Sequence, residues 1–159
     1  MAGESRPFAA VQELHSMEDT EALGQRIAAR LGRGDAVALA GDLGAGKTTL
    51  ARAILHAMGV MENVPSPTFT LVQTYETQRF PVRHFDLYRV ETVSELDELG
   101  LDEALDEGAA LIEWPERAET RLPVTTLRVA LSVEGDGARR VALSGPASWK
   151  SAFGAAHVR

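Results

Sequence analysis

The residues best suited to chemistry form a glycine-rich stretch that ends in lysine and threonine. Residues 41–48 have the form G-x-x-x-x-G-K-[ST], in which glycines let backbone N–H groups come close to phosphate oxygens. The Lys47 ammonium would reach the β- and γ-phosphates, the Thr48 hydroxyl would contact a bridging Mg²⁺ ion, and Thr49 could donate to the α-phosphate. The stretch therefore predicts a phosphate-binding loop (P-loop) for a nucleoside triphosphate.

Two carboxylates further along the chain could complete this site. Asp86 is near the end of an expected strand, from which it can face the P-loop and its metal; the alternative is a strand-end turn residue. Glu113 follows the apolar run 109–112, which is typical of a buried parallel strand, and ligands bind at the carboxyl ends of such strands. Because a buried unpaired glutamate is costly, we expect Glu113 to bind Mg²⁺, directly or through water, or to orient the attacking water.

Thr68 is held at a defined point by a loop stiffened by Pro65 and Pro67, which favour extended neighbours. Two interpretations are open. Thr68 could be a switch threonine that senses the γ-phosphate and Mg²⁺, or part of a β-turn that leads into a strand.

The elements that must position these residues alternate between strand and helix patterns, which predicts an α/β fold. Strands are expected at residues 8–14 (an edge strand), 37–40, 69–75, 81–88, 109–112, 127–133 and 139–144. Helices are expected from the Ser16 cap through residue 31 and at 48–58, with a short helix or frayed end at 149–157. Residues 77–80 and 134–137 would form hairpin turns.

Length and composition indicate one domain of the P-loop NTPase type, with a mixed central sheet flanked by helices. A chain of 159 residues is too short for two nucleotide-binding folds. We therefore expect a single domain over residues 1–159, with the nucleotide-binding motifs in 41–116 and C-terminal strands and a short tail in 124–159.

Charge and residue usage exclude several function classes. The net charge of −7 disfavours independent binding to nucleic acid, because such proteins usually present a basic surface. The chain has no cysteine, which excludes disulfides, thiolate metal sites and a cysteine nucleophile. With no secretory signal in residues 1–12 and no run of about 20 apolar residues, we expect a cytoplasmic protein that does not contact a membrane.

The acidic residues concentrate in one segment. Residues 91–107 contain eight acidic and no basic side chains, with leucines spaced for two short amphipathic helices separated at Gly100. A solvated acidic face is the favoured interpretation, and a docking surface is the alternative. The histidines lack metal-ligand spacing and are expected to be surface or packing residues; they are His15, His56, His84 and His157.

Four blocks, in this order and spacing, resemble the TsaE (YjeE) family. They are GDLGAGKTT at 41–49, SPTFTLV at 66–72, HFDLYR at 84–89 and EWPE at 113–116. The P-loop alone is generic, but the combination is specific. The N-terminal helix also fits, whereas the chain beyond Thr120 matches only in length and strand-like character.

The resemblance implies a small bacterial P-loop ATPase, with ATP and Mg²⁺, needed to make threonylcarbamoyladenosine next to the anticodon of tRNA. It also implies docking on the TsaD–TsaB complex, where TsaD performs the transfer, ATP hydrolysis supports repeated cycles, and the partners hold the tRNA. The residues implied to bind nucleotide are Asp42, Leu43, Gly44, Ala45, Gly46, Lys47, Thr48 and Thr49.

The resemblance also implies roles beyond the P-loop. Thr48 and Glu113 would hold the metal, and the residues implied in catalysis are Lys47, the switch threonine Thr68, the Walker-B-like acid Asp86, and Glu113. Trp114 and Pro115 would shape the edge of the site. Which of Asp86 and Glu113 contacts the metal and which handles water is left open.

Two other functions share the P-loop. A small-molecule kinase usually needs an arginine-rich lid, and residues 90–116 contain no arginine. A guanine-nucleotide switch needs an Asn-Lys-x-Asp motif, which the chain lacks.

Overall fold

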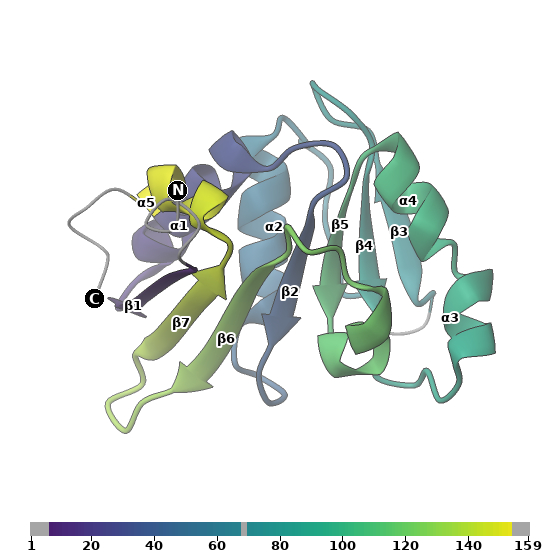
Figure 1. Ribbon diagram of the computed structural model, residues 1–159. Helices are drawn as coiled ribbons and strands as arrows, with labels where there is room; N and C mark the ends of the chain where they lie inside the picture. The colour runs from purple at the N-terminus through teal and green to yellow at the C-terminus, as the bar shows by residue number, and fades with distance from the viewer. Residues whose placement is uncertain (1–6, 68–69, 154–159) are drawn as a thin grey trace.

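A sheet of seven strands in the order β1-β7-β6-β2-β5-β4-β3 forms the centre of the molecule, with helices against both faces (Figure 1). The computed structural model describes residues 7–67 and 70–153. The strands are β1 (Phe8–Leu14), β2 (Ala36–Ala40), β3 (Val72–Tyr75), β4 (Val82–Asp86), β5 (Ala109–Glu113), β6 (Leu127–Val133) and β7 (Arg139–Gly145). The helices are α1 (Met17–Arg30), α2 (Lys47–Ala57), α3 (Val93–Glu98), α4 (Leu101–Glu107) and α5 (Lys150–Phe153), with 3₁₀ turns η1 (Pro115–Arg121) and η2 (Ala147–Trp149). The predicted α/β fold with a mixed sheet is therefore confirmed.

The neighbouring strands β6, β2, β5 and β4 run parallel to one another. Their carboxyl ends consequently share one edge of the sheet, at the bottom of Figure 1. The remaining pairs are antiparallel: β7 with β6, β1 with β7, and β3 with β4. In open α/β sheets the carboxyl edge is where ligands bind, and the chain leaves β2 there to enter the P-loop.

Buried apolar side chains form one cluster on each face of the sheet. Because successive side chains of a strand point to opposite faces, β5 contributes Ala109 and Leu111 to the cluster under α1 and α2. Its other residues, Ala110 and Ile112, join the cluster under α3 and α4. Glu113 follows Leu111 by two positions, so its side chain lies on the α1–α2 face, together with the P-loop helix.

The helices α1 and α2 pack closely side by side. A Cβ atom added at Gly24 would lie 2.7 Å from the Ala53 Cβ atom, so only glycine permits this approach of the two helices. Leu23 and Ile27 of α1 are buried, and, as predicted, Ser16 caps the helix by accepting a hydrogen bond from the Asp19 N–H group. Residues of the first turn of α1 line the same cavity as residues at the start of α2.

Two predicted strands are shorter than expected. The strand predicted at 69–75 begins only at Val72, because Leu71 has a φ of 68° and its N–H group donates to the Pro67 carbonyl. Residues 68 and 69 lie outside the described residues. The strand predicted at 81–88 ends at Asp86, whose carboxylate accepts the Tyr88 N–H group and so turns the chain away from the sheet.

Other predicted elements are confirmed. The edge strand is β1, the acidic segment forms the two helices α3 and α4 on either side of Gly100, and β6 and β7 form the C-terminal hairpin. The predicted terminal helix corresponds to α5, and residues 154–157 lie outside the described part of the chain.

No helix within residues 7–67 and 70–153 is both long enough and apolar enough to cross a membrane.

Candidate functional site

The P-loop connects the carboxyl end of β2 to the first residue of α2. Gly41 opens the loop with a φ of 147°, and a Cβ atom there would lie 2.6 Å from the Leu131 carbonyl oxygen of β6. Glycine is therefore required at this position, both for its backbone conformation and for the close approach of β6. Lys47 begins α2, so the loop delivers its backbone N–H groups and a helix N-terminus to the same point.

Lys47 is folded back over the loop and is only 5% exposed. Its Nζ atom donates to the carbonyl oxygens of Gly41 at 2.5 Å and Asp42 at 3.0 Å, and lies 4.3 Å from the centre of the Trp114 ring. These contacts within the described residues are carbonyl dipoles and an aromatic ring rather than a carboxylate. The lysine charge is consequently available to an anion that enters the loop.

Glu113 joins the P-loop helix to the neighbouring strand. Its Oε2 atom accepts a hydrogen bond from the Thr48 hydroxyl at 2.8 Å and lies 2.7 Å from His84 Nε2. Glu113 is 3% exposed and His84 is fully buried. A carboxylate removed from water in this way needs partners for its charge, and the hydroxyl and imidazole supply them.

Asp86 lies next to Glu113, because the two residues are paired in register at the ends of β4 and β5. Both carboxylates line a small cavity of about 110 Å³. The residues around this cavity are Leu43, Gly44, Lys47, Thr48, Ser66, Asp86, Glu113 and Trp114. The cavity therefore brings the loop lysine and threonine together with two acids from adjacent strands.

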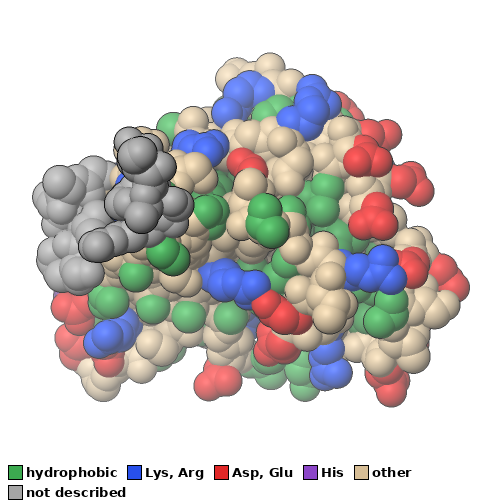
Figure 2. Space-filling view, in the orientation of Figure 1, with side chains coloured by type: hydrophobic (Ala, Val, Ile, Leu, Met, Phe, Trp, Pro, Cys, Tyr) green, Lys and Arg blue, Asp and Glu red, His purple; other side chains and the backbone are tan. Residues whose placement is uncertain are grey.

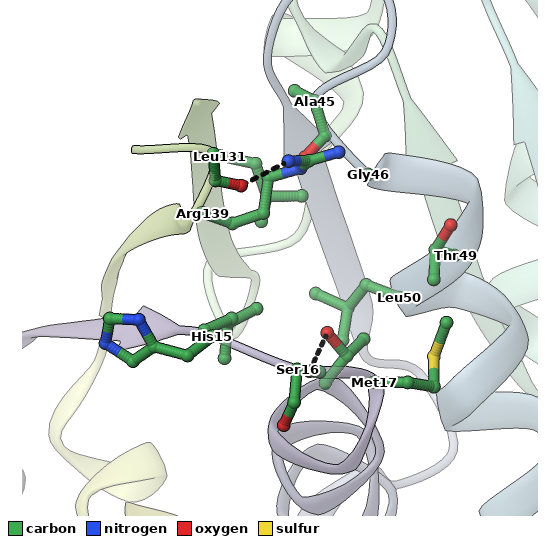
Figure 3. Close-up of a pocket in the computed structure, with 12 residues that line it drawn as sticks. His15, Ser16, Met17, Ala45, Gly46, Thr49, Leu50, Leu131 and Arg139 are labelled. Carbon is green, nitrogen blue, oxygen red and sulfur yellow. Dashed lines mark hydrogen bonds between the residues drawn. The ribbon is translucent and has the colours of Figure 1, made fainter. Parts of the chain in front are cut away.

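A second cavity, of about 240 Å³, lies on the other side of the P-loop (Figure 3). Its walls come from the end of β1, the first turn of α1, the loop and start of α2, and the β6–β7 hairpin. Figure 3 shows His15, Ser16 and Met17 on one side and Gly46, Thr49 and Leu50 on the other. Because Gly46 and Thr49 belong to the P-loop and its helix, this cavity extends from the P-loop toward α1.

Arg139 of β7 ties the C-terminal hairpin to the outside of the P-loop (Figure 3). Its Nε atom donates to the Ala45 carbonyl at 3.0 Å and its Nη2 atom to the Gly44 carbonyl at 3.3 Å. Its Nη1 atom donates a third hydrogen bond, to the Gly137 carbonyl within the hairpin. In a P-loop the backbone N–H groups point inward, toward the position of the phosphates, so the backbone carbonyls point outward. The Arg139 guanidinium gives two of these outward carbonyls hydrogen-bond partners.

Comparison with known proteins places this geometry in a family. The family model for "Threonylcarbamoyl adenosine biosynthesis protein TsaE" matches residues 14–141. The chain belongs to the TsaE family. A tRNA threonylcarbamoyladenosine biosynthesis protein TsaE of Rickettsia felis is 42% identical over 127 residues, which are 79% of this chain and 74% of the relative. The protein of that name from Bacillus subtilis is 39% identical over 125 residues, 78% of each chain.

A solved structure agrees with the family. The crystal structure of YdiB from Bacillus subtilis matches with a TM-score of 0.71 and 30% sequence identity. The match covers 89% of this chain and 86% of YdiB. The overall α/β fold described above therefore recurs in a solved structure.

Most site residues predicted for this TsaE-family chain lie around one loop. Lys47, Thr48, Asp86 and Glu113 line the smaller cavity, and Thr49 lines the larger one. Thr68 lies outside the described residues, so its predicted switch role stays a prediction.

The two residues expected at the edge of the site lie apart. Trp114 lines the smaller cavity, and its ring packs against Tyr88 at 4.8 Å between centroids. Pro115 is buried at the start of η1 and lines a groove on the opposite side of the sheet, with Ala38 and Ala40. Trp114 alone of this pair therefore contacts the smaller cavity.

The oxygen donors of the cavity fit Mg²⁺. This ion prefers oxygen ligands and is usually held by one or two carboxylates together with waters and substrate phosphates. Thr48, Asp86 and Glu113 supply a hydroxyl and two carboxylates. Within the described residues no group of three or more His, Cys, Asp or Glu side chains could hold a metal. The oxygen atoms present therefore suit a Mg²⁺ ion whose remaining ligands are phosphate oxygens and water.

Sequence reasoning missed two residues of the site. His84, expected to be a surface or packing residue, is fully buried and in addition contacts Glu113. Its position two residues before Asp86 on the same strand was a usable signal, because alternate strand residues share a face. Arg139 has no comparable signal, since its contacts depend on β7 reaching a loop 94 residues away in sequence.

Proposed function

We propose that this TsaE-family chain binds ATP with Mg²⁺ and hydrolyses it in support of tRNA threonylcarbamoyladenosine biosynthesis. The names of its relatives from Rickettsia felis and Bacillus subtilis support the biosynthetic role. The observation that carries the ATPase part is the Thr48–Glu113 hydrogen bond, which unites the P-loop with a strand-end acid. We propose a single domain over residues 1–159, with the nucleotide motifs in 41–116.

In this proposal the triphosphate lies against the P-loop, with Lys47 exchanging its carbonyl contacts for phosphate oxygens. The nucleoside would occupy the larger cavity, because its wall at Gly46 and Thr49 continues directly from the loop. Met17 and Thr20 of α1 would then face the nucleoside. The N-terminal helix would thus contribute to the nucleotide site as well as to the core.

Glu113 and Asp86 would have different roles. Both hydrogen bonds that the described residues make to the Glu113 carboxylate go to Oε2, which leaves Oε1 for a metal ion or its water. We assign Thr48 and Glu113 to the metal, and Asp86, which lines the same cavity, to the attacking water. When bound, Mg²⁺ would neutralise charge that develops on the phosphates.

The chain would act through partner proteins. We propose that it docks on a TsaD–TsaB complex, which would hold the tRNA and perform the threonylcarbamoyl transfer. The acidic balance supports this division, because a subunit with a net charge of −7 is poorly suited to bind RNA by itself. Acidic side chains gather over α3 and α4 (Figure 2). Hydrolysis by the isolated chain is expected to be slow if the partner orders the site.

A small-molecule kinase is a weaker candidate. The segment that would serve as its lid forms α3 and α4, which are anchored in the core by Leu96 and Leu101. The arginines beside these helices are paired with acids, Arg83 with Glu107 and Arg121 with Asp97. A mobile arginine-rich lid is therefore not supported.

Reconstituted tRNA modification tests the proposal. Reactions with TsaD and TsaB would be run with and without this chain, under conditions in which each complex must turn over repeatedly. Product beyond the first cycle should require the chain and should be lost with Lys47→Ala and with Glu113→Ala. Lys150→Ala and Glu116→Ala, which change residues outside the site, should behave as wild type. Equal product without the chain would refute the proposed role.

A further inference from the structure

We infer that His84 is a positioning residue that holds the Glu113 carboxylate in the orientation needed to bind the metal. The inference rests on the proposed function, because it assigns Glu113 to Mg²⁺. Its basis is the 2.7 Å contact between His84 Nε2 and Glu113 Oε2 inside the core of the sheet.

The strand register explains how the two side chains meet. His84 of β4 is paired with Leu111 of β5, and Glu113 follows two residues later on the same face. A diagonal neighbour at this separation is within reach of a long side chain. The imidazole therefore approaches Glu113 from the side of the sheet, while Thr48 approaches it from α2.

A role in packing alone does not account for a histidine here. The ring is fully buried, and its Nδ1 atom has no hydrogen-bond partner among residues 7–67 and 70–153. Val82 and Tyr75, close to His84 along the hairpin, belong to the apolar cluster on this face. Burying a polar ring with one nitrogen unpaired is unfavourable, and the contact with Glu113 is the interaction that offsets it.

The contact has a specific consequence for the metal. An ionised carboxylate can only accept hydrogen bonds, so in that state the Thr48 hydroxyl and a protonated His84 Nε2 both donate to Oε2 and fix the rotation of the carboxylate. Oε1 is thereby left for a metal ion or its bound water. Without the His84 donor, Thr48 alone would restrain the carboxylate, while the backbone groups that contact phosphate would be unchanged. Loss of His84 should therefore weaken metal-dependent binding and leave metal-independent nucleotide binding intact.

The test measures the dissociation constant of a non-hydrolysable ATP analogue by calorimetry, in EDTA and in Mg²⁺. The ratio of the two constants is the gain due to the metal. His84→Gln and His84→Asn form a matched pair, because the Gln amide nitrogen can take the place of Nε2 whereas the shorter Asn amide cannot reach Glu113. The gain should fall about tenfold in His84→Asn and be largely kept in His84→Gln, with binding in EDTA unchanged in both.

A double-mutant cycle separates positioning from general damage to the fold. In a Glu113→Gln background, His84→Asn should cause no further loss of the metal-dependent gain, because the group that it positions is already altered. A further loss of the metal-dependent gain in the double variant would overturn the inference. Equal losses of this gain in His84→Gln and His84→Asn would also overturn it, and so would a gain in His84→Asn as large as in wild type. If His84→Asn does not fold, a loss of the gain in folded His84→Gln overturns the inference and its retention supports it.

The inference and the proposed function fail in different ways. Absence of analogue binding by the wild-type chain would overturn the proposed function and, with it, the inference. Wild-type binding with a clear gain from Mg²⁺, unaltered by His84→Asn, would overturn the inference alone.

Discussion

The Thr48 hydroxyl donates a hydrogen bond of 2.8 Å to Glu113, although the two residues are 65 positions apart in sequence. The parallel pairing of β2 with β5 creates this contact, because it places the end of β5 beside the loop that leaves β2. Glu113 Oε2 also contacts His84 of β4. The Glu113 carboxylate therefore links the P-loop helix to the central sheet.

The first prediction concerns this hydroxyl. Thr48→Val keeps the shape of the side chain but removes its oxygen, and should weaken binding of the Mg²⁺ complex of ATP by roughly tenfold or more. Thr48→Ser keeps the oxygen and should bind nearly as well as wild type. Calorimetry on the two variants checks the expectation, and equal affinities for Val and Ser would show that the oxygen has no part in binding.

The second prediction concerns Arg139. Its guanidinium donates to the Ala45 and Gly44 carbonyls, so Arg139→Gln should loosen the outer side of the P-loop. Loss of hydrogen bonds from a charged donor should reduce ATP affinity by roughly tenfold, both in EDTA and in Mg²⁺. Arg140→Gln is the matched control, because Arg140 is the exposed neighbour on the same strand. Arg139 would have no influence on the loop if both variants bound ATP alike.

The third prediction concerns Gly41. A Cβ atom at this position would lie 2.6 Å from the Leu131 carbonyl, in a backbone conformation with a φ of 147°. Gly41→Ala should therefore lower the free energy of unfolding by about 1–3 kcal/mol, measured by denaturant titration. Gly135→Ala, in open space at the β6–β7 turn, should change it little. Equal stability of Gly41→Ala and wild type would contradict the close approach of loop and β6.

The fourth prediction concerns pH. Burial raises the pKa of Tyr75, the nearby Glu62 raises it further, and Arg52 lowers it. Because the folded pKa lies above the unfolded value of about 10, the stabilising effect is present below that pH and is lost as pH rises through the folded pKa. Tyr75→Phe lacks the titrating group, so its stability should fall less than that of wild type in alkaline solution. Unfolding curves from pH 8 to above the folded pKa would check this; parallel declines would refute it.

The sequence was sufficient to predict the parts of the site that local pattern specifies. The spacing of residues 41–48 predicts the loop, and the apolar run before Glu113 predicts a buried strand with an acid at its end. The alternation of strands and helices predicts the α/β class. Each of these features is encoded within a few consecutive residues.

Features that depend on strand order could not be predicted in the same way. The contact between His84 and Glu113 requires β4 to pair with β5 in a particular register. The hydrogen bond from Arg139 to the Ala45 carbonyl requires β7 to lie within reach of the P-loop. Composition and periodicity do not carry this information.

The central claim is that a nucleotide and its metal bind between the P-loop and the two strand-end acids. The most direct test is an anomalous difference map from crystals grown with a non-hydrolysable ATP analogue and Mn²⁺ in place of Mg²⁺. The account predicts a single strong peak beside the Thr48 hydroxyl and the Glu113 carboxylate, with the phosphates against residues 42–49. A peak distant from both side chains, or phosphates bound outside the loop, would contradict it.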